Sequence, residues 1–362
     1  MSLIGKGFDQ LDTPALWVDL DLLDKNIAAL ASYFRQAQVG WRPHTKGIKI
    51  PAISHQLIAS GALGITCAKL SEAEVMAAAG IQDILVANQV VGEIKISRLV
   101  QMRHHSNVMA AVDHMENARQ ISRAALNAGV KVRLLVELDS GMQRCGVKPG
   151  PTAVQFACQV AELPGVEFAG FMAWEGHVVK IEDPIEKKAM TEKSVGSLVA
   201  TAELCRQAGL EVAIVSCGGT GSFHTTAHIP GVTEIQAGGG IFGDVTYRRW
   251  RAGMDCALFI LSTVISCPVP GRAVVDAGRK AMNIEYSMPE PLYLPGVELK
   301  GCSAEHGILA LDAHAPPLNV GDRINFIVGY EDLTLFLHDR LVGMRNNTVE
   351  IIWDIQGRGK LY

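Results

Sequence analysis

The stretch EVAIVSCGGTGSFHTTAHIPGVTEIQAGGG, residues 211–240, contains two short β-prone runs, and each run ends in a glycine-rich loop. From residue 41 to about residue 240, further runs of this kind alternate with amphipathic stretches rich in Ala, Leu, Glu and Lys. The alternation predicts eight strands, at 41–46, 64–69, 83–88, 107–113, 131–139, 166–174, 211–217 and 233–238. Eight is the strand number of the TIM-type barrel, so we predict the α/β class with a (β/α)8 barrel.

A different pattern begins after about residue 252, where β-rich runs are separated by Gly, Pro and Asn without strong helical periodicity. We predict a second, all-β domain there. The early run ALWVDLD, 15–21, lies outside the eight predicted strands, and we expect it to pair with the β domain before a helix at 22–38. The predicted domains are therefore a barrel at 22–250 and a β domain made of 1–21 plus 251–362.

The alternative fold is a doubly wound sheet with a dinucleotide site, because the run from Gly238 to Gly243 satisfies the pattern GxGxxG. The match occurs late in the chain and inside a glycine run. It is followed by Tyr247-Arg248-Arg249-Trp250 and by no clear βαβ unit. The sequence therefore favours the barrel.

The composition of the 362 residues predicts a folded globular protein, because 48% are hydrophobic and only 19% are charged. Lys and Arg number 33 against 37 Asp and Glu, which gives a formal net charge of −4, and no block of like charges occurs. We expect neither nucleic acid nor a membrane as a partner. The eight cysteines form no CxxC pair, and residues 1–17 lack the basic start and apolar run of a signal peptide, so we expect reduced thiols and a cytoplasmic location.

Polar groups gather where the predicted strands end, which is where a TIM-type barrel places its functional residues. The first strand ends in Arg42-Pro43-His44-Thr45-Lys46, the fifth runs into Asp139–Arg144 and the sixth into Trp174–His177. The seventh and eighth end in Ser216–Gly221 and Gln236–Gly240, whose small residues let backbone N–H groups surround a phosphate. A lysine facing such loops suits pyridoxal 5'-phosphate (PLP), which needs an amine and a phosphate anchor, although the spacing equally allows an ordinary sugar phosphate.

Five motifs occur in order along the chain: Arg42-Pro43-His44-Thr45-Lys46, Gly141-Met142-Gln143-Arg144-Cys145-Gly146, Glu175-Gly176-His177, Gly218-Gly219-Thr220-Gly221 and Ser303-Ala304-Glu305-His306-Gly307. Together they resemble the D-threonine aldolase and D-serine dehydratase family. This family belongs to the fold type III PLP enzymes and is related to alanine racemase. The resemblance extends from about residue 12 to residue 359 and implies a homodimer in which the β domain closes the partner's active site.

The resemblance implies which residues bind the cofactor. Lys46 forms the Schiff base with PLP, and His44 is expected to orient it. Arg144 hydrogen-bonds the phenolic oxygen, and Gln236 occupies the place of the racemase arginine against the pyridine nitrogen, so that PLP is a weaker electron sink. The residues expected around the phosphate are Ser216, Gly218, Gly219, Thr220, Gly238 and Gly239.

Each of these assignments has a structural alternative. Lys46 could form a surface ion pair, Arg144 could pair with Asp139, and Gln236 could satisfy only loop backbone. His177 is the candidate acid/base for a substrate β-hydroxyl, and its alternative is stacking on the pyridine ring.

The sequence departs from the family where the relatives bind a divalent metal. The family's His-x-Asp or His-x-Cys pair aligns with Tyr330-Glu331-Asp332, so the histidine is replaced by Tyr330. Asp332 alone would hold Mn, Mg or Zn weakly. Three further changes lie near the expected site: Ile48 replaces a histidine, Trp174 a tyrosine, and Gly239-Gly240 a Ser-Tyr pair.

The leading hypothesis is a PLP-dependent lyase that cleaves D-β-hydroxy-α-amino acids, such as D-threonine, to glycine and an aldehyde. A racemase or epimerase is the second, with Tyr330 as a phenol opposite Lys46, and a D-β-hydroxy-amino-acid dehydratase is the third. A PLP carrier without turnover is less favoured, because such carriers end with the barrel. The small-molecule partner in each enzyme hypothesis is an amino acid.

Overall fold

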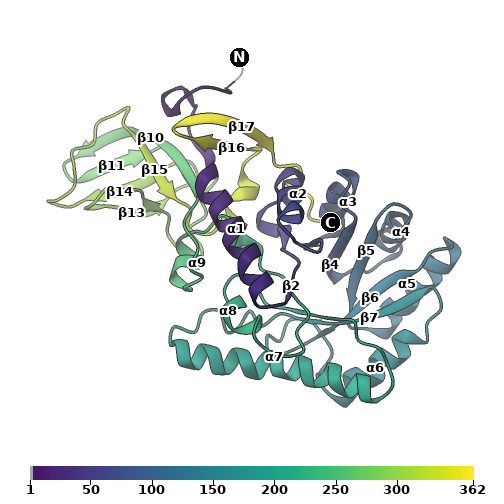
Figure 1. Cartoon of the computed structure of the whole chain (residues 1–362). Helices are drawn as coiled ribbons and strands as arrows, with labels where there is room; N and C mark the ends of the chain where they lie inside the picture. Colours follow the sequence, from purple (N-terminus) through teal and green to yellow (C-terminus); the bar gives the residue numbers. More distant parts are fainter. Residues whose placement is uncertain (1–2) are drawn as a thin grey trace. The chain divides into compact units, whose positions relative to one another are not determined.

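The computed structural model describes residues 3–362, so the first two residues of the predicted β-domain segment lie outside it. The chain divides into two compact units, a barrel unit and a β unit (Figure 1). The barrel unit contains Ala31–Lys46, Pro51–Gly238 and Gly359–Tyr362, and the β unit contains the residues up to Leu30, Gly47–Ile50 and Gly239–Arg358. The domain boundaries predicted from the sequence, 22–250 for the barrel and 1–21 plus 251–362 for the β domain, remain a proposal. The division by contacts places residues 239–250 in the β unit.

Eight parallel strands form one curled sheet in the barrel unit, in the order β2-β9-β8-β7-β6-β5-β4-β3. An isolated parallel bridge between His44 and Thr66 joins the two ends of this order. The predicted TIM-type barrel is therefore confirmed, and every predicted strand overlaps an observed one. The strands are β2 (Gly40–Trp41), β3 (Ile65–Cys67), β4 (Asp83–Gln89), β5 (Asn107–Val112), β6 (Val132–Leu138), β7 (Val166–Ala173), β8 (Ile214–Cys217) and β9 (Glu234–Ile235).

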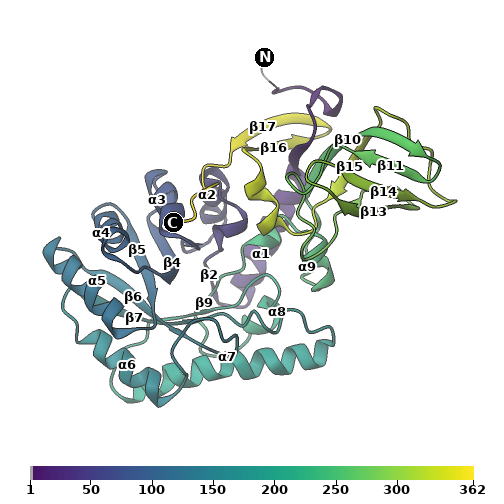
Figure 2. The same ribbon diagram turned by 180° about the vertical axis from the view of Figure 1, so that it is seen from behind.

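Apolar side chains from neighbouring strands form a buried cluster in the barrel unit, which includes Leu85, Met109, Leu135 and Met172. Helices lie along the outer side of the sheet, as Figure 2 shows for α4 to α7. The long α7 begins after Asp183, whose carboxylate accepts from the N–H groups of Ile185 and Glu186. The helices are α2 (Pro51–Ala59), α3 (Leu70–Ala78), α4 (Glu93–Met102), α5 (Met115–Asn127), α6 (Pro151–Ala161), α7 (Pro184–Gln207) and α8 (Phe223–Thr226), and α1 (Leu20–Gln36) contains the boundary between the two units.

The β unit is built on a nine-stranded sheet in which only the β1–β16 pair is parallel. The early segment Ala15–Asp19 forms β1 and pairs with β10 on one side and β16 on the other, which confirms its expected place in the β domain. The GxGxxG match leads into a short helix, α9 (Val245–Arg249), and then into this antiparallel sheet, so it starts no βαβ unit. The other strands are β10 (Leu258–Val269), β11 (Arg272–Val275), β12 (Glu290–Pro291), β13 (Val297–Cys302), β14 (Gly307–Leu311), β15 (Arg323–Ile327), β16 (Arg340–Arg345) and β17 (Thr348–Asp354).

None of the helices within residues 3–362 has both the length and the apolar character that crossing a membrane requires.

A buried ion-pair cluster supports the barrel where β4 and β9 begin. Arg42 Nε donates to both carboxylate oxygens of Glu234, at 2.9 Å each, and Arg42 Nη1 donates to Asp83. The side chains of Arg42 and Glu234 are 4% and 3% exposed. A buried charge is tolerated only when paired in this way, so Arg42 holds three strands together and is a structural member of the Arg-Pro-His-Thr-Lys motif.

Substituting Arg42→Ala leaves two carboxylates without their cation, so we expect the free energy of unfolding to fall by about 3–5 kcal/mol. Urea unfolding followed by circular dichroism measures the loss. The matched control is Arg123→Ala, because Arg123 and Glu116 form an exposed pair and such pairs contribute about 1 kcal/mol or less. Equal effects of the two substitutions would contradict a supporting role for Arg42.

Candidate active site

Lys46 lies in a short 3₁₀ turn, Thr45–Gly47, that follows strand β2. The Thr45 hydroxyl donates to the fully buried carboxylate of Glu72, at 2.7 Å. The Lys46 N–H donates to Nδ1 of His44, at 3.3 Å. These bonds fix the backbone of the turn and leave the Lys46 side chain half-buried.

The first glycine loop, which follows β8, is tied to a buried carboxylate. The Gly218 N–H donates to Glu175 Oε2 at 3.3 Å, and the Ser222 hydroxyl donates to Glu175 Oε1 at 2.6 Å. The Gly219 N–H donates to the Ser222 hydroxyl at 3.1 Å, so Glu175 holds Gly219 through one intermediate side chain. Burial raises the pKa of Glu175, and the hydrogen bonds from Ser222 and Gly218 oppose that rise.

Close packing explains why small residues occupy both loops. A Cβ at Gly219 would lie 2.5 Å from the ring of Trp174, and one at Gly238 would lie 2.0 Å from the carbonyl oxygen of His44. The second loop is therefore pressed against the segment that leads to Lys46. Gln236 Nε2 donates to the Ser216 hydroxyl at 2.9 Å, which links the two loops.

The two loops thus fit a phosphate group, because they combine bare backbone with buried hydroxyls. Thr220 and Ser216 are both buried in the barrel unit. Gly239, also predicted to contact the phosphate, belongs to the β unit.

Arg144 forms its ion pair with Glu137, not with Asp139. The distance from Arg144 Nη2 to Glu137 Oε1 is 3.6 Å, and Gln89 donates to the other oxygen of Glu137 at 2.5 Å. Asp139 instead accepts from the N–H groups of Gly141 and Gln143, at 3.0 and 2.9 Å, so the alternative pairing considered for Arg144 is wrong. Burial raises the pKa of Glu137, and the Gln89 hydrogen bond and the Arg144 charge oppose that rise.

His177 stands beside the loop that contains Arg144. A Cβ at Gly141 would lie 3.0 Å from two atoms of the His177 ring. Its Nδ1 is buried and has no hydrogen-bond partner among the residues that the structure describes. Buried ring nitrogens are normally paired, so this one is available to a bound molecule.

Tyr330 and Asp332 belong to the β unit and contact each other. The Tyr330 hydroxyl donates to Asp332 Oδ2 at 3.4 Å, and its ring centroid is 4.8 Å from that of Tyr286 and 5.8 Å from that of Tyr247. Burial and the charges of Glu331 and Asp332 raise the pKa of Tyr330, which keeps the phenol protonated. Within residues 3–362, no group of three or more His, Cys, Asp and Glu side chains could hold a metal ion. Tyr330 offers a protonated phenol where the family has a histidine, which leaves Asp332 as the one matching ligand, so these donors do not fit a metal held firmly by this chain.

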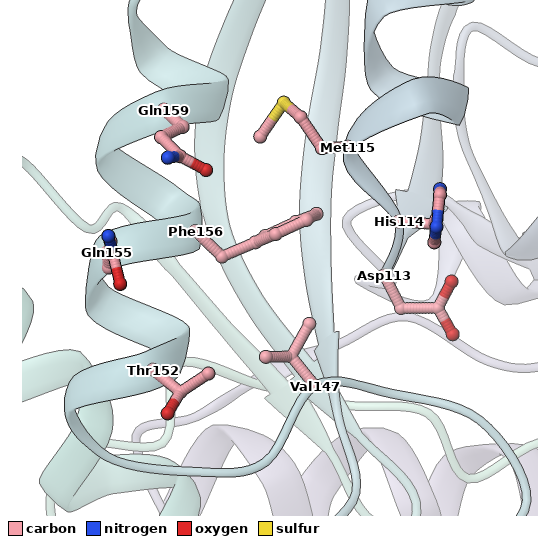
Figure 3. A pocket seen from close by; sticks show the side chains of 8 residues that line it. All are labelled: Asp113, His114, Met115, Val147, Thr152, Gln155, Phe156 and Gln159. Carbon is pink, nitrogen blue, oxygen red and sulfur yellow. The ribbon is translucent and has the colours of Figure 1, made fainter.

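A separate pocket of about 450 Å³ lies in the barrel unit beside the starts of α5 and α6. Figure 3 shows the ring of Phe156 reaching between Met115 and Val147. Asp113, which also lines it, accepts from the N–H of Gly146 at 2.9 Å. The residues predicted for the active site are not among those that line this pocket: Asp113, His114, Met115, Val147, Thr152, Gln155, Phe156 and Gln159.

The sequence does not predict the supporting roles of two carboxylates, Glu137 beside Arg144 and Glu175 beside the first glycine loop. Glu137 lies within strand β6, where an apolar run gives no sign that one acid turns toward Arg144. Glu175 belongs to the motif Glu175-Gly176-His177, in which the sequence points to His177 as the functional side chain.

Comparisons with known proteins agree along the whole chain. The family described as alanine racemase, N-terminal domain, matches residues 18–246, and the putative serine dehydratase domain matches residues 257–344. A D-threonine aldolase from Arthrobacter sp is 35% identical over 359 residues, which cover 98% of this chain and 95% of that protein. The chain belongs to the D-threonine aldolase and D-serine dehydratase family.

Other members of this family are similarly close. A 3-hydroxy-D-aspartate aldolase from Paracoccus denitrificans (strain Pd 1222) is 32% identical, covering 100% of this chain and 96% of that protein. The crystal structure of D-threonine aldolase from Filomicrobium marinum has a TM-score of 0.95 at 35% identity and covers 100% of both chains. This family member is therefore an enzyme, a lyase in kind, and membership in the family implies PLP.

Removing the Ser222 hydroxyl separates Gly219 from Glu175 and leaves a buried carboxylate short of a donor, at a cost of about 1–3 kcal/mol. We therefore expect Ser222→Ala to raise the dissociation constant for PLP about tenfold. Equilibrium dialysis with absorbance of the bound PLP measures it.

The control for Ser222→Ala is Ser60→Ala, whose hydroxyl bonds only to the Gln56 carbonyl one turn earlier. An unchanged dissociation constant in Ser222→Ala would show that Glu175 does not support the loop.

Proposed function

We propose that this enzyme cleaves D-β-hydroxy-α-amino acids of the D-threonine type into glycine and an aldehyde. Full-length likeness to a D-threonine aldolase supports the proposal, together with the two glycine loops that fit a phosphate beside the Lys46 turn. When bound, PLP supplies an electron sink for the negative charge that develops on Cα as the Cα–Cβ bond breaks.

We propose that Lys46 holds the cofactor through its amine, while the loops after β8 and β9 hold the phosphate. The N–H groups of Gly218 and Gly219 already donate to Glu175 and Ser222, so these glycines give room for the phosphate, and the hydroxyls of Ser216 and Thr220 would donate to it. Arg144, kept in place by Glu137, would donate to the phenolic oxygen. Gln236 is a neutral amide and offers no carboxylate to keep a pyridine nitrogen protonated, which limits the electron sink and its side reactions.

His177 is proposed to take the proton from the substrate β-hydroxyl. Its buried Nδ1 has no hydrogen-bond partner within residues 3–362, so a substrate hydroxyl would satisfy it. An imidazole can accept a proton near neutral pH, and loss of the β-hydroxyl proton starts the cleavage of the Cα–Cβ bond.

The contacts of Tyr330 favour cleavage over racemisation. A two-base racemase needs a phenol that is free to approach Cα, whereas the Tyr330 hydroxyl already donates to Asp332 and its ring is 7% exposed among other rings. Dehydration is less favoured, because the donors that would hold a metal to help the hydroxide leave are not assembled in residues 3–362. Asp332 remains a predicted ligand only in the event that a substrate also binds the ion.

We further propose a homodimer in the cytoplasm. The dimer rests on the resemblance to the family. The cytoplasmic location is supported by the eight cysteines, all of which are free thiols, as a reducing compartment keeps them.

The direct test incubates the PLP-loaded protein with D-threonine and with D-allo-threonine, in Mn²⁺ or in EDTA, and separates the products by chiral chromatography. We expect glycine and acetaldehyde, with activity in EDTA within about threefold of that in Mn²⁺, because Tyr330 replaces the family's metal-binding histidine and leaves Asp332 as the one matching ligand. Lys46→Ala should lose the activity. L-threonine isomers without glycine would establish a racemase or epimerase, and 2-oxobutanoate a dehydratase. A sizing column run on the same sample should show twice the chain mass.

His177→Phe separates proton transfer from ring stacking, because phenylalanine keeps the ring and loses both nitrogens. We expect kcat for D-threonine cleavage to fall by about 10²–10⁴, with the dissociation constant of PLP changed by less than about threefold. His105→Phe, at an exposed position, is the control. Retained activity in His177→Phe would mean that the ring only stacks.

A further inference from the structure

The carboxylate of Glu331 lies between two glycines of the β unit. Gly47 directly follows Lys46 in the chain, and Gly239 belongs to the second glycine loop. A Cβ at Gly47 would lie 2.5 Å from Glu331 Oε1, and one at Gly239 would lie 2.0 Å from the same oxygen. Neither glycine has the positive φ that would itself require glycine. Glu331 is therefore the reason why both positions carry no side chain.

Two hydrogen bonds hold Glu331 in this place, and a third joins its two partners. The Tyr247 hydroxyl donates to Glu331 Oε1 at 3.0 Å, and the Glu331 N–H donates to Asp244 Oδ2 at 2.8 Å. Asp244 also caps α9 by accepting from the Tyr247 N–H at 2.7 Å. Glu331, Tyr247 and Asp244 form a closed and buried network, whose members are 1%, 5% and 0% exposed.

We infer that Glu331 is a positioning residue, which sets the backbone beside Lys46 against the second phosphate loop. The inference rests on the proposed function, because the spacing between the Lys46 amine and the phosphate loop matters only if PLP binds to both. Burying a carboxylate is costly, and an apolar side chain would fill the same space more cheaply. What the carboxylate adds is a fixed orientation, since Oε1 accepts from Tyr247 and occupies the space in which a Cβ at either glycine would lie.

This arrangement also accounts for a departure from the family noted in the sequence. Gly239-Gly240 replaces the Ser-Tyr pair of the relatives, and a serine at 239 would collide with Glu331. The Tyr247 hydroxyl lies 2.3 Å from the same Cβ position. The segment expected to bind a metal thus places Glu331 against Gly47 and Gly239, within the β unit.

The test is a double-mutant cycle between positions 47 and 331, because the three atoms nearest to a Cβ at Gly47 all belong to Glu331. We expect Gly47→Ala to raise the PLP dissociation constant about tenfold through the clash, and Glu331→Ala to raise it about fivefold through loss of the support. The double variant should bind PLP more tightly than Gly47→Ala alone. Each variant is also monitored by the absorbance maximum of PLP bound at Lys46.

Two further variants keep the test informative if Gly47→Ala does not fold. Glu331→Gln keeps the shape and an acceptor for Tyr247, so it should bind PLP within about twofold of wild type, and Tyr247→Phe should weaken PLP binding about threefold. Gly301→Ala is the control, because a Cβ there meets nothing within 4 Å.

Two results would overturn the inference and leave the proposed function intact. One is Glu331→Ala with the wild-type PLP affinity and absorbance, and the other is a double variant that binds PLP no more tightly than Gly47→Ala. A wild-type chain that does not bind PLP would instead overturn the proposed function, and the inference with it.

Discussion

The close approach of the second glycine loop to the end of strand β2 is the constraint on which the candidate site depends. The backbone at Gly238 meets the His44 carbonyl at a distance that no side chain could share. The loop proposed to bind phosphate and the turn that contains Lys46 are therefore held together by backbone contact, with no flexible side chain between them. Such contact allows little adjustment, which suits a cofactor anchored at both ends.

A buried carboxylate lies next to each of three parts of the candidate site and fixes its position. Glu175 holds the loop after β8, Glu137 holds Arg144, and Glu331 lies behind Gly47 and Gly239. None is expected to touch the reacting atoms. Each accepts hydrogen bonds from neighbours, which is the condition under which a buried carboxylate is tolerated. In the proposed site these three acids would therefore position other groups and would transfer no proton themselves.

The strand and loop pattern of the barrel was predictable, because apolar periodicity and glycine-rich strand ends are local properties of the sequence. The same pattern places Lys46 and the two loops at strand ends, and the resemblance to the family supplies their expected roles. Arg42 appears in the same motif as Lys46 but turns to Glu234 and Asp83, and nothing local reveals which way a side chain turns from a strand two residues long. The contact of Glu331 with Gly47 joins distant parts of the chain, and only the fold shows it.

The bridge between His44 and Thr66 is where the ends of the curled sheet meet, and it lies two residues before Lys46. The adjoining pair of β2 with β9 contains only two residues on each strand. Backbone hydrogen bonds continue past this pair, from the Arg42 N–H to the Ile235 carbonyl and from the His44 N–H to the Gln236 carbonyl. The closure of the sheet and the placement of the lysine therefore rest on the same run of bonds, and any opening of the barrel at this point would displace the lysine.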